Sequence, residues 1–151
     1  MNNKYNSLAY ELKISKLNNN SFKSEDISDS ENAYKFAKKF YFEDIGIFES
    51  FFIIILNKAN KAIGWYKISQ GGTCGTVVDI KVIAKVAVDS LASSVILVHN
   101  HLSGNVKASK EDINITNKVK NALSLFEIRL LDHLIITEGL DYYSFASDGK
   151  L

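Results

Sequence analysis

The sequence predicts a three-layer α/β domain, with helices packed on a mixed β-sheet. The apolar run at residues 51–56 has the pattern of a central strand that is covered on both faces, and residues 94–98 predict a second, short buried strand. Apolar residues recur at helical spacing in two longer segments that follow these runs. A hairpin followed by strand–helix–strand units favours this architecture. The chain of 151 residues, of which 46% are hydrophobic and 23% charged, is long enough to bury the core of one such domain.

The N-terminal part of the chain predicts a strand, a loop and a helix. Alternating apolar residues indicate a half-buried strand at residues 8–15, and the polar segment 17–27 is typical of a loop. Ser28, Asp29 and Ser30 are candidate N-caps of a helix of about three turns. The apolar residues at helical spacing are Ala33, Phe36, Ala37 and Phe40. We expect a single domain over residues 1–151, with an N-terminal strand and loop over about 1–29 and a core over about 30–149.

The remaining core elements follow in order along the chain. Residues 51–56 predict a buried strand, 57–60 a turn, and 62–68 the return strand of a hairpin. A glycine-rich loop spans 71–75, a helical stripe runs over 80–91, and a short buried strand covers 94–98. A further helix starts near Ser109, with its apolar stripe at Ile115, Val119, Ala122, Leu123 and Phe126. Residues 128–137 predict another strand, and 142–145 predict a last short one.

Composition and charge argue against several classes of protein. Cys74 is the only cysteine, so no intrachain disulfide can form and a reducing compartment is expected. The N-terminus lacks the apolar segment of a secretory signal, and the longest apolar run is far too short to cross a bilayer. We therefore expect a cytoplasmic protein without membrane contact. Arg129 is the only arginine, the lysines are scattered and the net charge is +1, which argues against direct DNA binding.

The segment around two histidines predicts a metal site. His99 and His101 follow the apolar run 95–98, and Asp112 comes eleven positions after His101. Side chains at i and i+2 of an extended segment point the same way, so both rings can reach one metal ion. Two imidazoles and one carboxylate are the ligand set of a catalytic zinc that keeps a position open for water. The alternatives are a surface turn for the histidines and helix capping for Ser109 and Asp112, although capping by Ser109 is compatible with metal binding by Asp112.

A zinc site of this kind needs a group that transfers protons. Zinc lowers the pKa of its bound water to about 7, and a nearby carboxylate can take the proton and later deliver it to the leaving group. Glu49, just before the apolar strand at 51–56, is the candidate. The alternative is that Glu49 faces solvent at the edge of that strand. Cys74 has no histidine near it in the sequence, which argues against a catalytic thiol.

These residues resemble a known family. Glu49, His99, His101, Ser109 and Asp112 match the pattern Glu…His-x-His-x7-Ser-x2-Asp of the JAMM, or MPN, metalloprotease superfamily. The chain resembles more closely the RadC-like JAB-domain proteins of bacteria, in segments 69–73, 77–79, 99–104, 109–112 and 131–133. The resemblance runs from about residue 30 to residue 149. It implies a JAB/MPN-type domain with a cytidine-deaminase-like architecture.

The resemblance also implies a role for each residue of the pattern. His99, His101 and Asp112 would bind Zn²⁺, Glu49 would act as general acid and base, and Ser109 would help to stabilise the oxyanion of a tetrahedral intermediate. The implied reaction is hydrolysis of an amide or isopeptide bond in a peptide substrate by a zinc-activated water. One alternative is a DNA-repair or DNA-transaction accessory protein, with DNA-repair or mobile-element proteins as partners. The other is a catalytically silent zinc-binding interaction module.

Several positions near the motif need separate comment. Leu102 and Ala108 stand where the family usually has proline, which would stiffen the ligand loop, although neither position supplies a ligand. Lys81 stands where the family usually has arginine, so a bidentate contact is not expected there. Ser103 matches a motif serine, for which loop geometry is the alternative role. His133 is expected to pack, or to hydrogen-bond beside the ligands, rather than to bind the metal.

Overall fold

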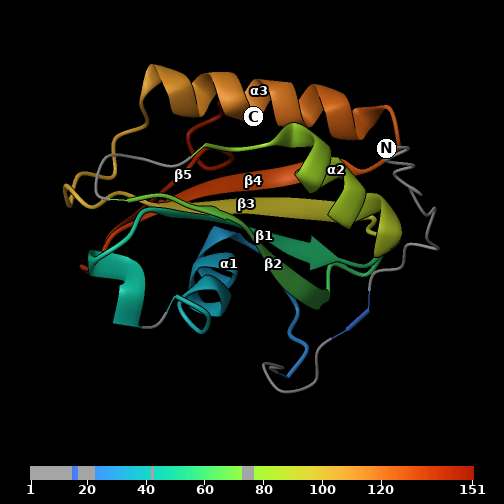
Figure 1. Cartoon of the computed structure of the whole chain (residues 1–151). Coiled ribbons are helices and arrows are strands. Elements are labelled where there is room, and N and C mark those ends of the chain that lie inside the picture. Colours follow the sequence, from blue (N-terminus) through green and yellow to red (C-terminus); the bar gives the residue numbers. More distant parts are fainter. Residues whose placement is uncertain (1–14, 17–22, 42, 73–76) are drawn as a thin grey trace, which may run out of the picture.

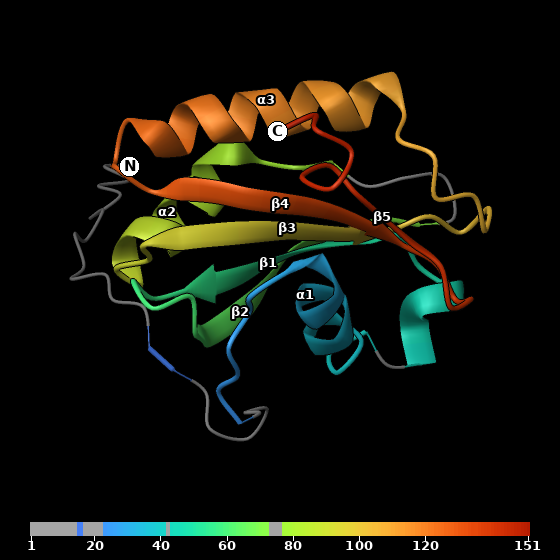
Figure 2. The ribbon, with the colours of Figure 1, turned by 180° about the vertical axis from the view of Figure 1, so that it is seen from behind.

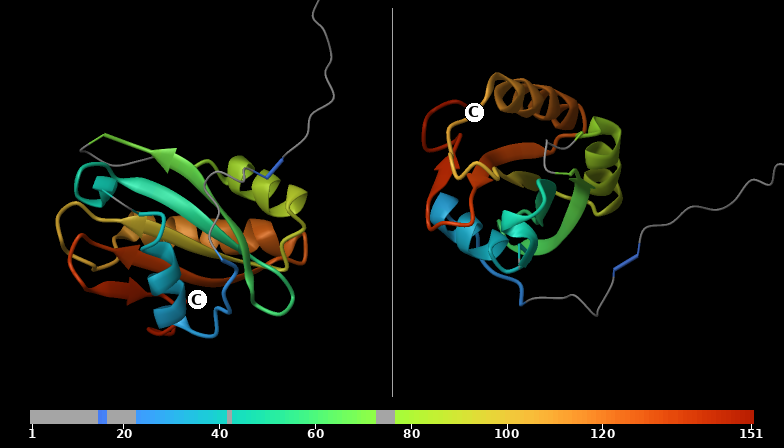
Figure 3. Two further views of the ribbon diagram at one scale, coloured as in Figure 1. Left: turned by 90° about the horizontal axis from the view of Figure 1, so that it is seen from below. Right: turned by 60° about the vertical axis from the view of Figure 1, so that its left-hand side comes forward.

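The protein is described by a computed structural model that covers residues 15–16, 23–41, 43–72 and 77–151. A five-stranded sheet forms its middle layer. Helices α2 (Ile80–Asp89) and α3 (Lys110–Ser124) cover one face of the sheet, and α1 (Ser30–Ala37) packs on the other (Figure 1). The view from behind and the two further views, one of them from below, show the same order of layers (Figures 2 and 3). The predicted three-layer α/β fold is therefore confirmed.

The sheet is mixed, as predicted, with the strand order β2-β1-β3-β4-β5. The strand β1 (Ser50–Leu56) pairs antiparallel with both β2 (Ala62–Gln70) and β3 (Ser94–Asn100). The strand β4 (Arg129–Ile136) pairs parallel with β3 and antiparallel with β5 (Tyr142–Ser144). Because α3 connects the two parallel strands, β3 and β4 end at the same edge of the sheet. The candidate site lies at this edge.

The central strands bury both of their faces, which explains their continuous apolar sequence. All residues of β1 and β3 are buried. Alternate residues face opposite layers, so Ile54 of β1 and Val98 of β3 belong to the core cluster around α1. Ile53 of β1 and Leu97 of β3 belong to the cluster beneath α2 and α3. This alternation decides toward which layer each side chain at the end of β3 points.

Some elements differ from the predicted ones. The helix α1 is N-capped by Asp29 and has 8 residues, so it is shorter than the three turns predicted. Phe40 packs into the core from the turn after the helix, which explains why its helical spacing was misleading. A short 3-10 helix, η1 (Glu43–Gly46), has no predicted counterpart. The strand β3 runs to Asn100, two residues beyond the predicted end, and includes His99.

Parts of three predicted features lie outside the described residues. These are residues 8–14 of the first strand, residues 17–22 of the loop that follows it, and the part of the glycine-rich loop that contains Cys74. Within the described ranges, no helix combines the length and apolar character that a membrane-spanning segment needs.

Candidate metal centre

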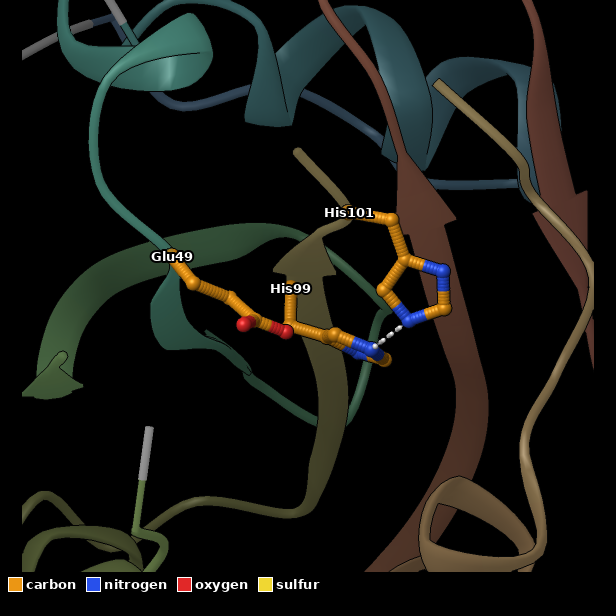
Figure 4. Close-up of side chains that lie close together, drawn as sticks. All are labelled: Glu49, His99 and His101. Atoms are coloured by element: carbon orange, nitrogen blue, oxygen red, sulfur yellow. Dashed lines mark hydrogen bonds between the residues drawn. The ribbon is translucent and has the colours of Figure 1, made fainter. Parts of the chain in front are cut away.

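The two histidines of the motif point toward the α2 and α3 side of the sheet. His99 is the penultimate residue of β3, and His101 follows the strand directly. Leu97, two residues before His99, lies in the core cluster beneath α2 and α3. Side chains two residues apart share a face, which brings the Nε2 atoms of His99 and His101 to 2.9 Å from each other (Figure 4).

Asp112 reaches the same point from the first turn of α3. Its Oδ1 lies 3.1 Å from Nε2 of His99, and its Oδ2 lies 3.4 Å from Nε2 of His101. Ser109 is the N-cap of α3: its hydroxyl oxygen accepts the backbone N–H of Asp112 at 3.1 Å, and its own N–H donates to Oδ2 at 2.7 Å. The capping box and the approach of Asp112 to the histidines thus occur together.

These three side chains fit a metal ion. The Nδ1 atom of His101 lies 2.8 Å from the backbone carbonyl oxygen of Asn105, and because a carbonyl cannot donate, neutral His101 carries its proton on Nδ1. Its Nε2 lone pair therefore faces His99 and Asp112. Tetrahedral zinc, with bonds of about 2.0–2.1 Å, holds its ligand atoms roughly 3.3 Å apart. The two histidine nitrogens are 2.9 Å apart, and the nearest carboxylate oxygens of Asp112, Oδ1 to His99 and Oδ2 to His101, lie at 3.1 and 3.4 Å, which is close to that value.

The charges at this point favour a cation. Burial opposes ionisation of Asp112, but donation from Nε2–H of His101 and His99, in the protonated form of these rings, outweighs burial and holds the pKa of Asp112 far below its usual range. The hydrogen bond with Asp112 raises the pKa of His101, against the opposing effect of burial. A positive charge between these groups is therefore stabilised, whether a proton or a metal ion supplies it.

Glu49 approaches the histidines from a different element. It immediately precedes β1, and its half-buried side chain points toward them (Figure 4). One carboxylate oxygen of Glu49 and one ring nitrogen of each histidine all lie within 4.8 Å of one another. Glu49 also lines a hollow of about 170 Å³, whose other lining residues are Phe51, Val78, His99, Glu111, Asp112 and Ile115. The carboxylate thus faces the same space as the ligand cluster.

Asn100, between the two histidines, points to the opposite face of the sheet. It is fully buried, and its side-chain amide hydrogen-bonds to the backbone of Ile45, Phe48 and Ser50. These three residues flank Glu49, so Asn100 holds the segment that carries the carboxylate. Asn100 has no predicted role, although strand alternation alone places it opposite the histidines.

His133 of β4 lies behind the cluster and is fully buried. Its Nε2 is 2.8 Å from Nδ1 of His99, and its Nδ1 is 2.6 Å from the hydroxyl oxygen of Thr116 on α3. The ring therefore contacts His99 on the side away from Asp112. Thr116 has no predicted role, and only its position one helical turn after Asp112 could have drawn attention to it.

The remaining predicted residues have these places. The hydroxyl of Ser109 donates to Oδ2 of Asp112 at 2.7 Å, so its proton is engaged there. Ser103 is exposed, and its hydroxyl oxygen accepts the backbone N–H of Asn105 at 3.3 Å, within the loop. Lys81 is exposed in the first turn of α2, where its N–H donates to Asp79.

The mixed sheet and the side-chain cluster at its edge define an α/β domain of the JAB type with a candidate metal centre. The model of one protein family, the RadC-like JAB domain, matches residues 27–150 of the chain. The chain belongs to this family, which confirms the resemblance inferred from the motif.

Curated relatives from bacteria carry the name UPF0758 protein, which states no activity or substrate. The one from Porphyromonas gingivalis is 41% identical over 127 residues, which are 84% of this chain and 55% of that protein. The one from Flavobacterium johnsoniae is 43% identical over 101 residues, which are 67% of this chain and 44% of that protein. The chain thus spans about half the length of the curated relatives it matches.

Proposed function

We propose that this protein is a zinc-dependent hydrolase that cleaves amide or isopeptide bonds with water as the nucleophile. The observation that carries the proposal is the convergence of Nε2 of His99, Nε2 of His101 and the carboxylate of Asp112 within 2.9–3.4 Å. The hollow that His99 and Asp112 share with Glu49 supports it further. When bound, zinc would polarise the carbonyl group and acidify the water.

Each side chain of the site would have its own role in this reaction. His99, His101 and Asp112 would hold the ion, and Glu49 would take a proton from the water and return it to the leaving amine. Ser109 is the proposed donor to the oxyanion. Because its hydroxyl proton is given to Asp112 at 2.7 Å, that role requires the hydroxyl to turn away from Asp112 during the reaction.

Metal content tests the site itself. Wild-type protein purified without chelator from zinc-supplemented cells is expected to carry about one zinc ion per chain by mass spectrometry. His101→Ala should lose the ion because a ligand is removed. Asp141→Ala, which removes an exposed carboxylate after β4, is the control and should retain it. Wild-type protein without bound metal would overturn the proposal.

Cleavage of a peptide and isopeptide library by the zinc-loaded protein tests the chemistry. Glu49→Gln should keep zinc and the fold but abolish cleavage, because an amide cannot accept the proton. Glu111→Gln is the matched control, since Glu111 lines the same hollow. It should retain cleavage. If the Glu49→Gln protein still cleaves, Glu49 is not the base.

A further inference from the structure

A buried chain of hydrogen bonds joins His99 to the backbone of Asp112 behind the site. His99 contacts His133 at 2.8 Å, His133 contacts the hydroxyl of Thr116 at 2.6 Å, and that hydroxyl donates to the backbone carbonyl of Asp112 at 2.5 Å. His133 and Thr116 are 0% and 1% exposed, so these contacts are shielded from solvent. One end of this series of hydrogen bonds is a carbonyl, which can only accept, so the donor and the acceptor of each bond can be assigned in turn.

The carbonyl of Asp112 fixes the direction of every hydrogen bond in this chain. A carbonyl only accepts, so the single hydroxyl proton of Thr116 is donated to it. The contact with Nδ1 of His133 then requires the proton to be on that nitrogen. The ring of His133 is 0% exposed and lies against Phe51 and Phe145, surroundings that disfavour a charged imidazolium, so the ring is neutral and its Nε2 accepts. Nδ1 of His99 must then be the donor in the last contact.

We propose that His133 and Thr116 are positioning residues that fix the tautomer of His99, with its proton on Nδ1 and a free lone pair on Nε2. Nε2 is the atom that faces His101 and Asp112. The inference rests on the proposed function, because it concerns the same site. A metal-binding histidine commonly donates its second ring N–H to a group that orients it, and here a neutral histidine is that group.

Aromatic packing keeps the ring of His133 in the required plane. It stacks on Phe145, with ring centroids 4.9 Å apart and an interplanar angle of 12°. It also contacts Phe51, whose ring stacks in turn on His99 at 5.7 Å and 12°. The plane of each ring is thus held by packing, while Thr116 determines which nitrogen of His133 carries the proton. Packing alone would hold the plane without selecting the tautomer.

Nitrogen-15 NMR of the histidine rings tests the proposal in the full chain after removal of metal with a chelator. At about pH 8, where histidine is ordinarily neutral, His99 and His133 should both show the proton on Nδ1. A proton on Nε2 of His99 would overturn the proposal. If wild-type protein binds no zinc, the proposed function fails, but the tautomers still test this inference independently.

A matched pair of Thr116 variants tests the consequence for metal binding. Thr116→Val keeps the shape but leaves Nδ1 of His133 without an acceptor, so zinc affinity should fall about 10-fold to 100-fold in a titration against a fluorescent chelator. Thr116→Ser keeps the hydroxyl and should bind zinc like wild type. Equal affinity of a folded Thr116→Val protein would contradict the proposal. If that variant does not fold, the NMR measurement of the His99 tautomer in the wild-type protein is the test of the proposal.

Discussion

The side-chain oxygen of Asn100 accepts the backbone N–H of Ser50 at 2.8 Å, which ties the end of β3 to the start of β1. The side-chain nitrogen of the same residue donates to the carbonyls of Ile45 and Phe48, at 2.7 and 2.8 Å. The segment that carries Glu49 is thus held by the residue between the two histidines. The buried amide of Asn100 therefore helps to fix the position of the Glu49 backbone relative to the proposed ligands.

Asn100→Asp should destabilise the fold. The variant keeps an oxygen for Ser50 but removes both donors and turns a carboxylate toward the carbonyls of Ile45 and Phe48. Each buried polar group left unpaired costs about 1–3 kcal/mol, so we expect a loss of at least about 2 kcal/mol in urea denaturation. Asn117→Ala, on the exposed face of α3, is the control and should change stability by less than about 0.5 kcal/mol. Unchanged stability of Asn100→Asp would mean that the amide network does not hold this segment.

Ser109→Ala should lower both stability and zinc affinity. The hydroxyl oxygen caps α3 by accepting the N–H of Asp112 at 3.1 Å, and its proton goes to Oδ2 of that residue at 2.7 Å. Loss of an N-cap costs about 1 kcal/mol, and Asp112 loses a partner that orients it. Ser109→Thr keeps the hydroxyl and should behave like wild type. If Ser109→Ala loses only turnover, with stability and zinc affinity unchanged, the serine acts on the oxyanion alone.

Stability of the metal-free protein should fall as the pH decreases below about 6.5. Burial, followed by repulsion from His99, lowers the pKa of His133 in the folded protein. Below about pH 6.5 the histidine therefore binds a proton in the unfolded chain but not in the folded protein. This contribution is fully present above about pH 6.5 and is lost at up to about 1.4 kcal/mol per pH unit below it.

Urea denaturation between about pH 7 and pH 5 measures this slope. His133→Gln should be less stable overall but show a shallower slope, because the titrating ring is gone. The raised pKa of His101 has the opposite effect on stability. The contribution of His101 to stability is fully present below about pH 6.5 and is lost as the pH rises above it. A flat profile below pH 6.5 in the wild type would contradict the assignment to His133.

Local patterns predicted much of the fold because each element's main interactions are local or periodic. The alternation along β3 places His99 and His101 on one face, and the apolar character of β1 follows from burial of both its faces. The start of α3 was predictable from Ser109, since a capping serine is a short-range signal. Phe40 shows the limit of such patterns: it has helical spacing but packs from a turn against Phe52 and Trp65, with ring centroids 4.9 and 4.8 Å apart.

Contacts between distant residues could not be predicted in this way. Asn100 reaches back 55 positions to Ile45, and His133 meets Thr116 across 17 positions. No periodic pattern encodes such pairs, because they depend on which strands and helices lie side by side in the finished sheet. The sequence therefore indicates the residues of the motif more readily than the buried residues that hydrogen-bond to them or to their backbone.

Leu102→Pro should stabilise the loop after the first two ligands. The N–H of Gly104 donates to the carbonyl of His101 at 3.3 Å, so residues 101–104 form a turn with Leu102 at its second position, where proline is favoured. The N–H of His101 donates to the carbonyl of Ile136 at 3.0 Å, which continues the extended pairing that a residue before proline prefers. Because proline restricts the unfolded chain, we expect a gain of about 0.4–1 kcal/mol and a higher Tm, with zinc affinity at least equal to that of wild type.

Ser103→Pro, one position later, is the matched comparison. Proline is disfavoured at the third position of a common turn, and the variant also removes the hydroxyl that accepts the N–H of Asn105 at 3.3 Å. We therefore expect Ser103→Pro to lower Tm while Leu102→Pro raises it. If both variants lower Tm, position 102 does not have the backbone conformation that proline imposes. The leucine in this chain would then mark a ligand loop that differs in shape from the proline-containing loop of its family.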